Sequence, residues 1–251
     1  MYKIYYIILV MLYEKIFVLF LSGASFYTIK KRSSLQKLIY PNVKFDSGVF
    51  MKQEAEIKKF FVLNTIHLVA TSGFDGATVR KIAELSRSQS GLKISETYVY
   101  RLFGSKENLY RAAFEFLDHD LYVAFMQGVE ATRGFTRDIR ERAYNFFDLA
   151  WKFLLKNEDR FRCYISYYHS PYFKGEVAEA HNKLFMGVVN QISPLFKEEA
   201  DVVSIAHSVL TTMLDFAFRV YNGDLEDNEE NRPHVFNVVY LTMSAYFKKT
   251  T

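Results

Sequence analysis

Hydrophobic residues recur every three or four positions from residue 57 onward, which is the spacing of an amphipathic α-helix. The first stripe lies in EAEIKKFFVLNTIHLVATSGF, where the apolar positions are 57, 60, 61, 63, 66, 69 and 70. Gly73 is placed to end this helix in a left-handed conformation. Thr78 can then cap a second helix, whose inner face is formed by Val79, Ile82 and Ala83.

A third helix is predicted in SETYVYRLFG, with Ser95 as its N-cap and Gly104 at its end. Its inward residues are Val99, Leu102 and Phe103, and its outward residues are Glu96, Thr97, Tyr98 and Arg101. Ser105 caps the next helix, which begins at Lys106. The sequence therefore predicts short helices in close succession between 78 and 110.

Helical periodicity continues to the C-terminus. Further helices are predicted over about 107–131, 136–156, 158–169, 175–193, 198–222 and 231–248. No segment shows the two-residue alternation of a half-buried strand, and 11 Gly and 4 Pro in 251 residues are few for a turn-rich β protein. The acidic stretch DLEDNEE at 224–230 lacks the glycine and ligand spacing of a calcium loop, so we interpret it as a solvated interhelix loop. The predicted fold class is all-α.

The first fifty residues differ from the rest. Residues 4–29 are almost continuously apolar, a length that suits a membrane span, and the run KKR at 30–32 would then lie on the cytoplasmic side. Glu14 and Lys15 near the centre of the segment count against a span. The alternative is that 1–50 is translated upstream sequence and that Met51 is the native start, because the composition changes there. We therefore expect three segments. Residues 1–50 form an extension, and two domains follow it over residues 51–112 and 113–251.

Charge favours a polyanionic partner for residues 71–111. This stretch carries seven Lys or Arg against four acids and is locally +3, within a chain of net charge +4. A recognition helix enters the major groove end-on, so Glu96, Thr97 and Tyr98 would face base edges. Tyr100 and Lys106 are placed to contact phosphates. A small helical bundle with an ordinary solvated face would show the same pattern.

The residues then suggest a family. From about 57 to 116, SGFDGATVRKIAEL followed by SETYVYRLFGSKENLYRAAF resembles the N-terminal domain of the TetR family of transcriptional repressors. The resemblance implies that Thr78 lies beside a phosphate, that Tyr100 is the recognition-helix tyrosine and that Lys106 is the phosphate-contacting lysine. It implies base-reading positions for Thr97 and Tyr98. Arg80 and Glu96 complete the candidate DNA-binding set.

One departure from the family pattern is RSQSGL, residues 87–92, between the second and third helices. It lengthens the corner by about six residues, where a helix-turn-helix turn normally has three or four. Ile94 would still be the apolar anchor. Either one more helical turn ends at Gly91 or the chain forms a bulged loop, and the angle of the recognition helix depends on which occurs.

For the C-terminal region the resemblance implies an effector-binding and dimerisation domain. The predicted helices 198–222 and 231–248 suit a four-helix interface with a second copy. An apolar pocket for an unknown small hydrophobic effector is expected among aromatic and Met side chains, and a hydrophobic cation held by aromatic faces is one hypothesis for this effector. The candidates are Phe147, Trp151, Tyr164, Tyr167, Phe185, Met186, Met213 and Phe216.

Other chemistry finds no support in the sequence. No His residues are spaced i, i+4, and the single Cys163 is too few for a cysteine-based zinc site, so no metal and no cofactor are expected. There is no Walker loop, G-x-S-x-G or H-E-x-x-H motif, so we expect no enzyme activity.

The function predicted is a cytoplasmic, ligand-responsive transcriptional repressor that binds a palindromic double-stranded DNA operator as a homodimer. Two alternatives remain. One is a helical sensor anchored to the membrane by residues 4–29, and the other is a protein-interaction module with a degenerate DNA-binding head.

Overall fold

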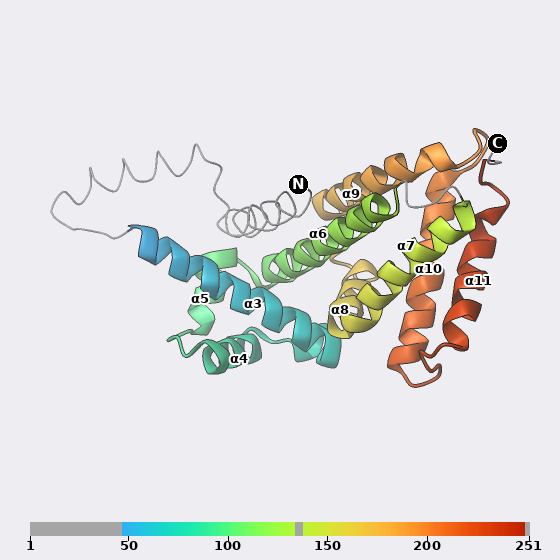
Figure 1. Ribbon diagram of the computed structural model, residues 1–251. Helices are drawn as coiled ribbons and strands as arrows, with labels where there is room; N and C mark the ends of the chain where they lie inside the picture. Colours follow the sequence, from blue (N-terminus) through green and yellow to red (C-terminus); the bar gives the residue numbers. More distant parts are fainter. Residues whose placement is uncertain (1–46, 134–137, 249–251) are drawn as a thin grey trace. The chain divides into compact units, whose positions relative to one another are not determined.

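The computed structural model describes residues 47–133 and 138–248, so the apolar segment 4–29 lies outside the described residues. The chain divides into two compact units. The first unit contains residues up to Thr65 together with Ala77–Leu109, and the second contains Ile66–Gly76 and the chain from Tyr110 onward. The described residues are almost entirely helical, as expected from the sequence (Figure 1).

The first unit is built from α3 (Ser47–Gly76), α4 (Val79–Ser90) and α5 (Glu96–Phe103). Its core contains the buried side chains of Phe61, Ile82 and Val99, which come from the three helices in turn. The ring of Phe61 meets that of Phe103 edge to face at 6.2 Å between centroids. Burial of these apolar side chains holds the three helices together, and α4 and α5, with 12 and 8 residues, would be marginal as isolated helices in water.

The helix ends follow the predicted punctuation. Gly73 interrupts α3 with φ 66° and ψ −177°, a backbone conformation that favours glycine. Thr78 caps α4 by accepting a hydrogen bond from the backbone N–H of Lys81 at 3.3 Å. Ser95 precedes α5 with an extended backbone, but its side chain makes no capping hydrogen bond.

The second unit contains α6 (Lys106–Thr132), which starts in the first unit, then α7 (Ile139–Lys156), α8 (Glu158–Tyr168) and α9 (Glu176–Ile192). After a 3₁₀ turn at Ser193–Leu195 follow α10 (Val202–Tyr221) and α11 (Asn231–Ser244). The last two helices are antiparallel neighbours, and both pack against α7 (Figure 1).

The end of the chain differs from the prediction. A helix was expected over 231–248, but α11 ends at Ser244, a turn follows at residues 245–246, and Phe247 forms an antiparallel bridge with Phe196. The N–H of Lys197 donates to the carbonyl of Tyr246 at 2.8 Å, and the N–H of Lys248 donates to the carbonyl of Leu195 at 3.0 Å. This short antiparallel pairing stacks the ring of Phe247 on Phe196 at 4.8 Å. Burial of these two rings favours the bridge over a longer helix, and the helical pattern of the sequence did not indicate it.

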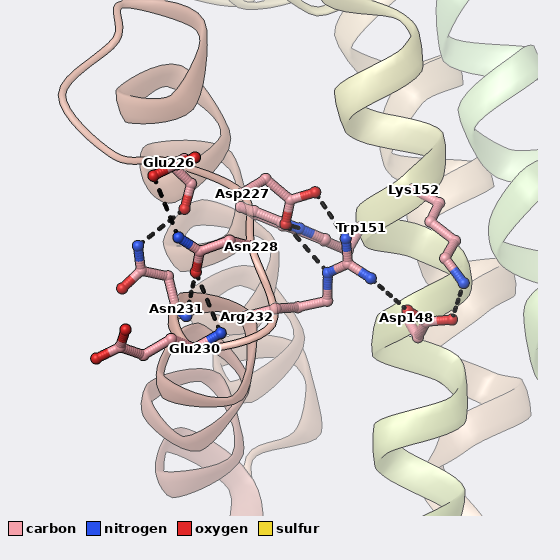
Figure 2. Close-up of polar contacts among 9 residues, drawn as sticks. All are labelled: Asp148, Trp151, Lys152, Glu226, Asp227, Asn228, Glu230, Asn231 and Arg232. Atoms are coloured by element: carbon pink, nitrogen blue, oxygen red, sulfur yellow. Dashed lines mark hydrogen bonds and ion pairs between the residues drawn. The ribbon is translucent and has the colours of Figure 1, made fainter.

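The acidic loop between α10 and α11 is structural and not merely solvated (Figure 2). Asp227 accepts a hydrogen bond from the indole N–H of buried Trp151 at 2.9 Å, and it pairs with Arg232 at 2.7 Å. Arg232 also lies 3.6 Å from Asp148 on α7. Burial opposes ionisation of Asp227, but the hydrogen bonds from Arg232 and Trp151 outweigh it and lower the pKa of this carboxyl.

Much of the apolar surface of α10 and α11 is uncovered. The side chains of Leu241, Val238 and Val203 are 72%, 44% and 38% exposed. Among the described residues, α10 is also the one helix whose length and composition would permit a membrane crossing, a test that apolar helices packed inside proteins pass as well. Only 22% of its most apolar stretch is buried within this chain.

We predict that Asp227→Asn lowers the free energy of unfolding at neutral pH by about 1–3 kcal/mol, because the Arg232 charge loses its partner. Since the folded-state pKa of Asp227 is lowered, its contribution is present above the unfolded pKa of about 3.9 and is lost as the pH falls through the folded value. Urea denaturation at pH 7 and pH 3 should therefore show the variant and the parent converging at acid pH. Asp224→Asn, an exposed position in the same loop, is the matched control and should change little at either pH.

Candidate nucleic-acid interface and internal cavity

The first unit presents α4 and α5 as consecutive helices joined by the RSQSGL segment. Of the two alternatives for this segment, an added helical turn or a bulged loop, the structure contains the added turn. Helix α4 continues to Ser90, and its C-cap is Gly91, whose φ of 68° is left-handed. The N–H of Gly91 donates to the carbonyl of Arg87 at 3.1 Å. Only the short link 91–95 therefore separates α4 from α5.

Arg87 belongs to the extra turn and fixes the start of α5. Its Nε donates to the carbonyl of Ile94 at 2.8 Å, and the Ile94 side chain is buried at the predicted anchor position. The hydrogen bond to Ile94 gives Arg87 a structural contact that sequence reasoning missed, because residues seven apart are not neighbours on one helix.

The predicted base-reading face is open on the N-terminal turn of α5. Glu96 and Thr97 are exposed, and Val99 is fully buried on the opposite face. Tyr98 is half-buried, and the guanidinium of Arg101 stacks over its ring, 4.2 Å from the centroid. Arg101 thus adds a cation beside the candidate surface.

The candidate phosphate contacts also lie at the surface. Tyr100 is 54% exposed, Thr78 and Arg80 are exposed, and Lys106 is half-buried at the start of α6. Arg80 forms an ion pair with Glu84 one turn along α4, 2.9 Å apart, and this hydrogen bond raises the pKa of Arg80. Ser105 caps α6 by accepting from the N–H of Asn108 at 3.1 Å, which orients the helix N-terminus at which an anion would be favoured.

The second unit contains an apolar cavity of about 150 Å³ that is partly open to the surface. One wall is a single face of α6 with Leu121, Phe125 and Val129, and α9 forms another with Leu184 and Val188. The two helices run in the same direction, because His181 meets Asp118 near one end and Arg133 meets Gln191 near the other. The C-terminal residues Met243 and Phe247 close the end near Thr132.

The cavity only partly coincides with the predicted pocket residues. Tyr164 and Phe185 line it, whereas Phe147, Trp151, Tyr167, Met186, Met213 and Phe216 do not. Phe147, Trp151, Tyr167 and Met213 are core residues, and Met186 is 39% exposed on α9. Aromatic content alone therefore did not separate packing residues from lining residues. The i, i+3, i+4, i+7 spacing of Asp118, Leu121, Tyr122 and Phe125 was the signal available for the lining of α6.

One end of the cavity is polar. Asp118 and His181 are each 6% exposed, and His181 Nδ1 lies 2.9 Å from Asp118 Oδ1. The hydroxyl of Tyr164 also approaches Asp118 Oδ1, at 3.4 Å. Burial and the neighbouring carboxylate raise the pKa of Tyr164 well above its usual value, so the phenol stays protonated. No group of three or more His, Cys, Asp or Glu side chains suited to a metal ion occurs within 47–133 and 138–248.

The fold of this chain is similar to that of several solved structures. A TetR family transcription regulator from Marinobacter aquaeolei VT8 matches with a TM-score of 0.63 and 17% identity, over 76% of this chain and 97% of that one. One from Shewanella sp. PV-4 matches with a TM-score of 0.60 and 16% identity, over 77% and 99%. The fatty acid degradation regulator FadR from Bacillus halodurans matches with a TM-score of 0.53 and 15% identity, over 72% and 96%.

The chain therefore has the fold of the TetR-family transcriptional regulators. At these identities the likeness establishes the fold, which the sequence motifs had predicted. No family profile matches the sequence, and no curated protein does.

We predict that Arg87→Ala weakens the link between α4 and α5, since the carbonyl of Ile94 loses its partner. The free energy of unfolding should fall by about 0.5–1.5 kcal/mol, measured by urea denaturation. Lys93→Ala, in the same link and exposed, is the control and should leave stability unchanged. Equal stability of the two variants would show that the Arg87 bond does not hold the extended turn.

Proposed function

We propose that this chain is a DNA-binding transcriptional regulator that acts as a homodimer and responds to a small apolar ligand. The observation that carries the proposal is the exposed N-terminal face of α5, where Glu96, Thr97 and Tyr100 project while Val99 is buried. This arrangement supports insertion of α5 into a major groove. The fold shared with transcription regulators from Marinobacter and Shewanella supports the same function.

The contacts proposed divide into two kinds. Glu96, Thr97 and Tyr98 read base edges, because they occupy the first exposed turn of α5. Thr78, Arg80, Tyr100 and Lys106 bind phosphate oxygens and fix the position of the helix on the duplex. The Arg80–Glu84 pair would have to open or rotate for Arg80 to take part.

The uncovered apolar residues of α10 and α11 support a homodimer. Leu241, Val238 and Val203 are exposed on neighbouring helices, and an isologous contact would bury them against the same residues of a second copy. Two α5 helices related by two-fold symmetry would then read a palindromic operator with half-sites roughly 34–36 Å apart.

The mode of regulation that we propose is repression. A ligand that occupies the cavity would change the spacing of the two α5 helices and so release the operator. Such a protein would act in the cytoplasm, and an anchor at 4–29 remains the alternative to be tested by cell fractionation.

The DNA contacts are tested by selecting bound fragments from random duplexes and then measuring affinities at stated salt concentrations. Lys106→Ala and Tyr100→Phe should weaken binding about equally for all sequences, and the lysine change should reduce the salt slope by about one. Thr97→Ala should relax the preference at one base pair by about 1–3 kcal/mol. Lys183→Ala, an exposed lysine of α9 in the second unit, is the charge-matched control.

Recovery of no palindromic sequence by the parent chain would contradict the proposal and favour a protein-interaction module. Unchanged affinity in Lys106→Ala and Tyr100→Phe would refute the phosphate assignments alone.

For the homodimer we predict that Leu241→Glu yields monomers, because a carboxylate would be buried without a partner in the interface. Sedimentation equilibrium measures the mass, and operator affinity should fall with the loss of the second recognition helix. Asn190→Glu places the same charge on the exposed surface of α9 and should leave the mass unchanged. A dimer that persists in Leu241→Glu would place the interface elsewhere.

A further inference from the structure

The apolar cavity contains a buried carboxylate with an unused acceptor. Both hydrogen bonds to Asp118, from His181 and Tyr164, involve Oδ1. No residue within the described part of the chain donates a hydrogen bond to its second oxygen, Oδ2. A buried charge is costly unless its hydrogen-bonding capacity is satisfied, so Oδ2 is a point at which a donor would be stabilised.

His181 adds a second acceptor beside the first. If the N–H of the neutral imidazole is at Nδ1, facing the carboxylate, Nε2 carries a lone pair. Nε2 likewise has no hydrogen-bond partner among the described residues. In this form of His181, the carboxylate of Asp118 and Nε2 are two acceptors at one end of the cavity, and they complement a group rich in N–H donors.

Two aromatic rings line the cavity beside this polar end. The centroids of Phe185 and Tyr164 lie 6.3 and 6.4 Å from that of His181. The negative faces of such rings attract a cation that has left water. Beyond them, Leu121, Phe125 and Val188 continue the lining with apolar groups, which suit a hydrocarbon and not a second polar group.

The size of the cavity limits the ligand. About 10–15 Å³ holds one water-sized group, so about 150 Å³ accommodates roughly ten such groups. The row from Asp118 to Thr132 along α6 covers roughly 21 Å at about 1.5 Å per residue, which favours an elongated body over a globular one.

We propose that the cavity binds an amphiphilic amine whose ammonium group is held by Asp118 and His181 and whose apolar body of about ten atoms lies between α6 and α9. This inference rests on the proposed function, for which the amine is the effector. A ligand with a negatively charged head group has a different candidate partner, Arg142. This residue lines the cavity toward the Phe247 end and forms no ion pair within the described ranges. A carboxylate ligand would bind there instead.

The test compares three ligands that differ only in the head group: decylammonium, 1-decanol and decanoate, each below its micelle concentration. Binding to the full chain is measured by isothermal titration calorimetry. Decylammonium should bind at least tenfold more tightly than decanol, and decanoate should bind most weakly. Asp118→Asn should remove the preference for the amine, whereas Arg142→Gln should leave the decylammonium affinity within about threefold of the parent.

Preference for decanoate, lost in Arg142→Gln, would overturn the proposal while leaving the cavity as an effector site. Equal binding of all three ligands, or of none, would also overturn it. Should Asp118→Asn fail to fold, the ranking of the three ligands by the parent chain decides the matter.

Operator release is measured separately, by adding decylammonium to the protein–DNA complex. Tight binding without release would support the ligand class and contradict ligand responsiveness. Failure to bind DNA at all would refute the proposed function without affecting the measured preference for the amine.

Discussion

Burial of Trp151 constrains the second unit, because its indole N–H must find an acceptor where water is excluded. Asp227 supplies that acceptor from the loop between α10 and α11, and Arg232 in turn compensates the charge of Asp227. These bonds fasten the α10–α11 hairpin to α7. The same hairpin carries the uncovered apolar surface and part of the cavity wall, so this polar contact helps to position both features.

The other end of the hairpin closes the cavity by a different means. After a turn at residues 245–246 the backbone pairs with residues 195–197, which places Phe247 against Phe196. A continued helix would have carried Phe247 along its own axis and away from residues 195–197. The helix thus ends at Ser244 because Phe247 can then pack against Phe196. Both rings line the cavity.

The helical fold and most helix ends were predictable because they follow from local signals, namely apolar spacing and residues such as Thr78, Gly73 and Gly104. Contacts between distant residues were not, since Trp151 with Asp227 and Asp118 with His181 leave no periodic trace in the sequence. The DLEDNEE stretch was therefore interpreted as solvated although one of its aspartates holds the core. For the cavity, Tyr164 and Phe185 were identified by residue type, while helical spacing along α6 would have found more of the lining.

The RSQSGL segment shows how an insertion can leave a helix pair intact. Adding a turn to α4 moves its C-terminal end along the helix axis, and a flexible link would then leave the start of α5 poorly defined. Gly91 reverses the chain direction in a left-handed conformation, and Arg87 reaches across the added turn to the carbonyl of Ile94. The buried Ile94 side chain keeps the anchor position that precedes α5. The hydrogen bond of Arg87 and the burial of Ile94 thus fix the start of α5, and the packing of Val99 and Phe103 holds the rest of this helix. The inserted residues themselves supply the hydrogen bond.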